Sequence, residues 1–322
     1  MGVKTYIARR LLEIVPIILA AVIINFTLLH TAPGDPALIL AGERADPEYI
    51  KVVREEFGLD KPLIEQLVIY LRNLLAGNLG YSYMYRKPVL AVMAERIPAT
   101  LLLIITSLSV ALVVGTLAGA FAARMYLTRI DTGLSMVSLV LYSMPVFWLA
   151  IVLVLVFSFT LKWFPITGMI TVGVQMGELE RFVDILWHLA LPSFSLATYY
   201  FGQYFRISRS SVVEVMREDY VTTARAVGFQ ENKVFTKYAL RNAILPVVTM
   251  AGLQIGYMFA GAVLTETVYT WPGLGRLILE AILSRDYPLI LGSYLIISVV
   301  VALATLFTDL TYALIDPRVA YK

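Results

Sequence analysis

The chain has 322 residues, of which 59% are hydrophobic and 15% charged, with a mean hydropathy of +0.77 and a formal net charge of +3. Soluble domains are about one-quarter charged, so this composition excludes an ordinary soluble protein and predicts an all-α polytopic membrane protein. There is no cysteine, which excludes disulfides and thiolate metal sites, and the two histidines, His30 and His188, are too far apart in the sequence to indicate a histidine metal site.

Six charge-free windows are each long enough to cross a bilayer as an α-helix, which needs about 20 residues. They are residues 14–34, 97–123, 132–161, 185–205, 242–265 and 287–308. The first window could instead be a cleavable signal peptide, because Lys4, Arg9 and Arg10 precede it. Its long apolar run and the lack of a clean small-x-small site favour an uncleaved span.

Prolines interrupt several of these windows, and each removes a backbone hydrogen bond and locally bends its helix. They are Pro16, Pro145, Pro192 and Pro246. In a bundle that opens and closes, such bends can frame a water-lined path. The alternative is that membrane helices simply tolerate them.

The distribution of basic residues predicts the orientation of the spans. The amino-terminal tail, the short second loop and the carboxy-terminal tail are basic, and the loop at residues 206–241 carries seven lysines and arginines. Residues of this kind accumulate on the cytoplasmic side of a membrane. Both termini are therefore expected in the cytoplasm, which agrees with an even number of spans.

The segment between the first two windows, residues 35–96, predicts a small helical insertion on the outer side. Asp46 and Pro47 can open one helix, which Gly58 can close, and a second can run from Pro62 to a stop at Gly77. Their apolar faces are expected to pack on the top of the membrane domain. The same faces could also dock an extracytoplasmic binding protein.

The windows lack the groups that ion-coupled transport or catalysis requires. Aspartate, glutamate, lysine and arginine, which coupled transporters and pumps usually need within the bilayer, are missing from the windows, and His188 lies near a span end. There is no HExxH, GxSxG or GxxxxGK[ST] sequence, so the chain is not expected to be an enzyme or to hold a nucleotide. The amides Asn25, Gln203 and Gln254 remain as candidate pore-lining groups.

The segment DYVTTARAVGF at residues 219–229 predicts a short capped helix between the fourth and fifth windows. Asp219 is the expected N-cap, and Gly228 is the expected residue with positive φ after the helix ends. Tyr220, Val221, Ala224 and Val227 would form an apolar stripe with Arg225 pointing elsewhere, and small residues keep the helix slim. A second helical run, residues 231–240, leads back to the membrane. This segment could be a basic loop that only enforces topology, or an element that a soluble partner grips.

Short motifs along the whole chain resemble the dipeptide/oligopeptide family of ABC importer permeases, in the first (B-type) of its two permease subunits. The stretch from Thr222 to Leu240 resembles the EAA loop of these permeases, with Gly228 as its glycine, although Thr222, Thr223, Tyr238 and Arg241 depart from the pattern. Further matches follow in family order: PGDPA at 33–37, FGLDKPL at 57–63, GNLGYSY at 77–83, RIPATLLL at 96–103, SMPVFWLA at 143–150, ETVYTWPGLGRL at 266–277, RDYP at 285–288 and DLTYALIDPRV at 309–319.

The resemblance implies a type I ABC importer permease (MetI-like) fold in a prokaryotic cell membrane. Residues 1–34 would be the tail and first span, 35–96 the outer insertion, and 97–322 a five-helix core. The expected partners are a second homologous permease subunit, two cytoplasmic ATPase subunits that hold ATP and Mg²⁺, an extracytoplasmic binding protein and membrane lipid, with no nucleic acid.

The resemblance also assigns a role to the short helix, which would couple the permease to one ATPase. The residues concerned are Asp219, Tyr220, Val221, Thr222, Thr223, Ala224, Arg225, Ala226, Val227 and Gly228. The cargo is expected to be dipeptides or oligopeptides, with nickel, glutathione or oligosaccharide as alternatives within the family. A scaffold that anchors cytoplasmic proteins without transport is the alternative from another class.

Overall fold

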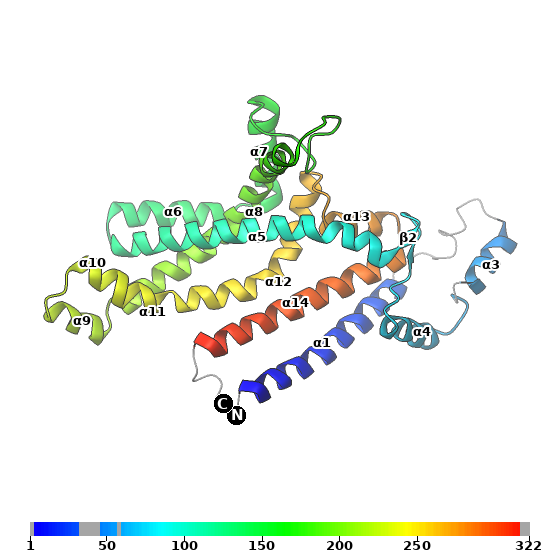
Figure 1. Cartoon of the computed structure of the whole chain (residues 1–322), viewed down its shortest axis with the longest axis horizontal. Helices are drawn as coiled ribbons and strands as arrows, with labels where there is room; N and C mark the ends of the chain where they lie inside the picture. Colours follow the sequence, from blue (N-terminus) through cyan, green and yellow to red (C-terminus); the bar gives the residue numbers. More distant parts are fainter. Residues whose placement is uncertain (1–2, 32–45, 57–58, 316–322) are drawn as a thin grey trace.

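The computed structural model describes residues 3–31, 46–56 and 59–315, which are almost entirely helical (Figure 1). The elements are α1 (Val3–Thr31), α3 (Pro47–Glu56), α4 (Leu63–Leu75), β1 (Tyr81–Ser82), β2 (Lys87–Pro88), α5 (Val89–Arg124), α6 (Arg129–Ser143), α7 (Val146–Leu153), the π-helix η1 (Val154–Thr160), α8 (Glu178–Val215), α9 (Asp219–Ala226), α10 (Glu231–Lys233), the π-helix η2 (Val234–Leu240), α11 (Arg241–Ala243), α12 (Leu245–Val268), α13 (Leu274–Leu283) and α14 (Tyr287–Ile315).

Three helical stretches of the described chain are long and apolar enough by themselves to cross a membrane. They are Leu12–Thr31, Val89–Arg124 and Tyr287–Leu306. A fourth candidate is the pair α6 and α7 with η1, which is bent by 97°. The window at 132–161 is therefore bent at Pro145, as the sequence predicts, and the bend is sharp enough to divide it into two helical segments. Pro145 donates no backbone hydrogen bond, and it holds Met144 in an extended conformation with ψ 131°.

Helix α8 differs from the expected fourth span in both length and polarity. It continues to Val215, so Arg206 and Arg209 lie on a helix and not in the loop at 206–241 to which the charge pattern assigned them. Pro192 lies inside it without ending it. Although α8 has 38 residues, it is not among the helices apolar enough to span a membrane by composition alone.

The long helices place the short elements at two opposite ends of the molecule (Figure 1). Helices α9 to α11 lie at one end, and α13, the β-hairpin and α4 lie toward the other. The first residues of α1 and the last of α14 point toward the α9 side.

The outer-insertion helices follow the sequence pattern at their starts and at one stop. The backbone N–H of Glu48 donates to the Asp46 carboxylate at the start of α3, and Gly77 has φ +75° just after α4. Tyr70 of α4 stacks on Phe26 of α1, with ring centroids 5.7 Å apart. Gly58 and the motif at 33–37 lie outside the described residues.

Glycines allow α5, α8 and α6 to pack at close backbone distance. A Cβ at Gly119 of α5 would lie 2.4 Å from the Phe205 carbonyl oxygen of α8, and one at Gly115 would lie 2.9 Å from the Phe201 carbonyl oxygen. Gly202 gives α8 the same close approach to Tyr142 of α6. This G-x-x-x-G spacing is the arrangement by which small residues bring membrane helices together.

A buried carboxylate joins α5, α12 and α13. Glu266 is fully buried near the end of α12. It accepts a hydrogen bond of 2.6 Å from the Thr100 hydroxyl of α5 and one of 3.0 Å from the backbone N–H of Arg276, in the first turn of α13. Glycine is required at Gly273 because a Cβ there would lie 2.1 Å from the Glu266 carboxylate. The motifs at 96–103 and 266–277 are therefore two halves of one junction.

A second buried carboxylate joins the hairpin to α14. Asp286 accepts hydrogen bonds from the Ser82 hydroxyl, at 2.6 Å, and from the backbone N–H of Met84, at 3.0 Å. It also accepts from the N–H of Leu289, at 3.2 Å, in the first turn of α14. Burial, together with the Asp286 carboxylate, raises the pKa of Tyr83 to about 12, so this phenol stays neutral at physiological pH. The motifs at 77–83 and 285–288 thus meet in space.

We expect Gly119→Ala to lower the free energy of unfolding by about 1–3 kcal/mol, because its Cβ would overlap the backbone of α8. The control is Gly133→Ala on α6, where a Cβ meets nothing within 4 Å, and which should be neutral or slightly stabilising. Thermal unfolding of the purified protein in detergent measures both. Equal melting temperatures for the two variants would contradict the close packing.

We expect Thr100→Val to cost about 1–3 kcal/mol of stability, because it leaves the Glu266 carboxylate and the Leu274 N–H without the hydroxyl that both now contact. Thr106→Val is the matched control on the same helix, since the Thr106 hydroxyl contacts only the Leu102 carbonyl of its own helix. The same thermal measurement applies. A Thr100→Val protein as stable as the control would refute the junction's importance.

Candidate functional site: the helix Asp219–Ala226 and three amides

Helix α9 begins one residue earlier than its sequence indicates. Glu218 is the N-cap, in an extended conformation and without a side-chain cap, so Asp219 is the first helical residue and not the expected cap. Its carboxylate still lies in the first turn, where negative charge is favourable beside the unpaired N–H groups of the helix. The helix itself lies where the sequence predicts it.

The end of α9 is a Schellman motif built on Gly228. Gly228 has φ +89°, and its N–H donates to the Arg225 carbonyl at 2.9 Å. The N–H of Phe229 donates to the Ala224 carbonyl at 3.3 Å. These two bonds satisfy carbonyls that a helix end otherwise leaves unpaired. The expected positive φ at Gly228 is confirmed.

Two apolar side chains fix α9 to the segment that follows it. Val221 is fully buried and Ala224 is 5% exposed, and both pack in a small cluster with Val234 of η2, against Phe229 and Tyr238. Polar contacts supplement this packing. The Tyr220 hydroxyl donates to the Tyr238 carbonyl at 3.3 Å and accepts a hydrogen bond from the Asn242 side-chain amide at 2.8 Å. Arg225 forms an ion pair with Glu231 at 3.0 Å.

The expected apolar stripe of α9 therefore divides into two parts. Val221 and Ala224 face the protein, whereas Tyr220 is 39% exposed and Val227 is 66% exposed. The outward surface also carries Thr222, Thr223, Arg225, Ala226 and Gly228, all exposed. This face is slim, without large side chains other than Tyr220 and Arg225, and nothing in the described part of the chain covers it.

The support of α9 is joined to the long helices. Phe235 of η2 packs in a cluster with Ala120 and Ala123 of α5, Val212 of α8 and Ala243 of α11. The Arg124 guanidinium lies 5.5 Å from the centroid of the Phe235 ring, and it also donates a hydrogen bond to Asn232. The segment that supports α9 is therefore packed directly against α5 and α8.

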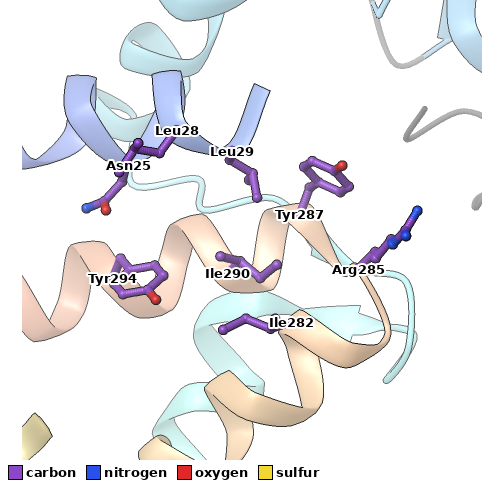
Figure 2. A pocket seen from close by; sticks show the side chains of 8 residues that line it. All are labelled: Asn25, Leu28, Leu29, Ile282, Arg285, Tyr287, Ile290 and Tyr294. Carbon is purple, nitrogen blue, oxygen red and sulfur yellow. The ribbon is translucent and has the colours of Figure 1, made fainter. Parts of the chain in front are cut away.

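The three amides expected to line a pore lie in three separate places. Gln254 of α12 is buried inside the subunit, beside Tyr200 of α8. Gln203 of α8 is half-buried beside Tyr199. Asn25 of α1 borders a cavity of about 350 Å³ between α1 and α14 (Figure 2). They do not form one polar cluster within this chain.

Two arginines of α8 that the charge pattern placed in a loop have different surroundings. Arg209 forms a bidentate pair with the buried Asp131 of α6, at 2.6 and 2.7 Å. Arg206 lies instead over the ring of Tyr142, with its Cζ 4.5 Å from the ring centroid. The charge pattern placed both arginines in a loop, because a charge at the edge of an apolar window is indistinguishable from a loop charge.

Among the described residues, no group of three or more His, Asp and Glu side chains is placed to hold a metal ion.

Residues 115–321 match the family described as binding-protein-dependent transport system inner membrane component. Residues 3–104 match a second family, described as the N-terminal part of the binding-protein-dependent transport system membrane component. The Di/tripeptide transport system permease protein DppB of Pseudomonas aeruginosa (strain UCBPP-PA14) is 38% identical over 333 residues, which cover 99% of each chain. The Oligopeptide transport system permease protein AppB of Bacillus subtilis (strain 168) is 37% identical, covering 98% of this chain and 99% of AppB. The Dipeptide transport system permease protein DppB of Escherichia coli (strain K12) is 37% identical with the same coverages.

We expect Gly228→Val to loosen α9, because a β-branched residue at φ +89° costs about 1–2 kcal/mol or more, although a Cβ there meets nothing within 4 Å. Gly228→Asn is the matched control, since asparagine tolerates this conformation. Hydrogen exchange of residues 219–229 should quicken in the valine variant and stay near normal in the control, with the long helices unchanged. Unchanged exchange in the valine variant would show that Gly228 does not hold the end of α9.

Proposed function

The chain belongs to the family of binding-protein-dependent transport system inner membrane components, and we propose that it is the permease subunit of an ATP-driven importer of dipeptides or oligopeptides. Matches over nearly the whole of this chain and of relatives named as peptide permeases support this cargo. The family is one of transport permeases and not of enzymes. We assign ATP and Mg²⁺ to partner subunits.

The exposed face of α9 is the observation that carries the coupling role. The helix is short, its end is closed by its own backbone hydrogen bonds, and Val221 and Ala224 anchor it to the protein. Most of its outer surface carries no large side chain. A groove in an ATPase subunit can accept such a helix without first ordering it. We place α9 in the cytoplasm, with both termini, because the basic residues gather on that side.

Transport then proceeds by alternating access. Closure of two ATPase subunits upon ATP binding moves α9, and the packed contacts of Phe235 pass that movement to α5 and α8. The pore forms between this chain and a second homologous permease subunit. An extracytoplasmic binding protein delivers the peptide to the outer side, where residues 35–96 form the insertion next to the core at 97–322.

A polar passage between subunits suits a peptide cargo. A free peptide carries two terminal charges, and removing each from water costs several kcal/mol or more. Gln203 is the one of the three amides that we retain as a pore-lining group on α8, because it is half-buried at the surface of that helix. Gln254 is buried in the interior of the subunit, and Asn25 lines the cavity between α1 and α14.

We expect Ala226→Trp to lower the ATPase activity that loaded binding protein stimulates by about tenfold or more, because the indole fills the outer face of α9 and prevents docking. The assay uses the whole reconstituted complex in proteoliposomes. Ala226→Ser, which conserves size, and Thr236→Trp, which adds the same bulk at an exposed position on η2, are the controls and should remain near normal. Full stimulation with Ala226→Trp would refute α9 as the docking helix.

A further inference from the structure

One exposed face of α8 carries a row of polar and aromatic side chains. Tyr199, Gln203 and Arg206 are spaced at i, i+4 and i+7, which places them on the same side of the helix, and Ser210 continues the row as an exposed residue. The opposite side of α8 is the one that the glycines of α5 contact. Tyr199 and Gln203 of this row are half-buried, with Tyr199 packed against the main hydrophobic core, and Arg206 and Ser210 are exposed.

The side chains of this row are organised by Tyr142 of α6. The Tyr142 ring stacks on Tyr199, with centroids 5.0 Å apart, and lies beneath the Arg206 guanidinium. Gln203 lies one helical turn beyond Tyr199 on the same side of α8. One guanidinium, two phenols and one amide thus lie together where α6 meets α8.

Arg206 is a cation without an acidic partner in the described residues, whereas its neighbour Arg209 is fully paired with Asp131. Arg206 lies nine residues before the end of α8, which is about 13 Å of helix. Side chains on a helix lean toward its N-terminus, so Arg206 leans away from α9, toward the final turn of α6.

A position of this kind is costly for a charge that faces lipid, and an ionisable group at membrane depth marks a substrate path or a partner. The composition of α8 agrees, since it is not apolar enough to be a membrane span by itself. The guanidinium is planar and presents parallel N–H donors, which fit a carboxylate in a bidentate manner. Phenol and amide groups beside it match the neighbouring peptide bond.

We infer that Arg206, with Tyr142, Tyr199 and Gln203, forms a site for the terminal carboxylate of the peptide cargo during its passage. This inference rests on the proposed function. It assigns to the permease a contact with a specific group of the cargo, and Arg206 is the residue that provides the opposite charge.

The test compares alanyl-alanine with its C-terminal amide, in proteoliposomes that contain the whole complex and saturating binding protein. The uptake rate of alanyl-alanine divided by that of the amide is measured for the wild type and for Arg206→Gln. Any preference of the binding protein cancels between the variants, because the same binding protein serves both. We expect the ratio to fall about tenfold in Arg206→Gln, which is the loss of one charge-assisted contact.

Three further variants complete the design. Arg206→Lys keeps the charge without the planar fork and should give an intermediate ratio, and it also serves where Arg206→Gln folds poorly. Tyr142→Leu removes the ring beneath Arg206, and the ratio of the two uptake rates should fall in this variant as well. Arg181→Gln, an exposed arginine at the other end of α8, should leave the ratio unchanged.

The possible failures are distinguishable. A wild-type complex that imports neither peptide would refute the proposed function, and this inference with it. Import by the wild type with an unchanged ratio in Arg206→Gln would refute this inference alone. A uniform loss of both peptides, accompanied by loss of the second permease subunit on purification, would assign Arg206 to the subunit interface or to lipid phosphate and would also refute it.

Discussion

The buried carboxylate of Glu266 is the constraint on which the arrangement of this permease depends. A charged group removed from water must be paired or hydrogen-bonded, and here the partners come from the Thr100 hydroxyl and from the first turn of α13. Because α5, α12 and α13 each contribute to one small volume, none can shift without exposing an unsatisfied group. Gly273 and Gly275 keep that volume small, since a Cβ at either position would strike Glu266 or α12.

The same helix that meets this junction also reaches the coupling end. Helix α5 runs from Val89 to Arg124, from the Thr100 contact past Gly115 and Gly119 to the contact with Phe235. Close packing on α8 along the middle makes the two helices move together. In the coupling that we propose, a push at α9 would reach α5 and α8 together and, through α5, the junction at Glu266.

The sequence predicted the elements that local chemistry controls and missed those that tertiary contacts control. Gly228 was identifiable because only a few residues adopt a positive φ at a helix end. Asp219 was misplaced by one position, since Glu218 offered no side-chain cap to reveal the true boundary. The 97° break at Pro145 exceeds an ordinary proline bend, because the extended Met144 before it interrupts the helix altogether. The sequence placed Arg206 in a loop because α8 continues as a helix beyond the end of its apolar window at residue 205.

The Schellman motif of α9 has a kinetic consequence for assembly. Its two backbone bonds and the burial of Val221 hold the helix formed while the outer face is bare. Segments that fold only on contact lose conformational entropy at that moment, and their affinity is reduced by that amount. In the docking that we propose, an ATPase subunit would meet α9 already in its final shape, and no refolding would be needed between transport cycles.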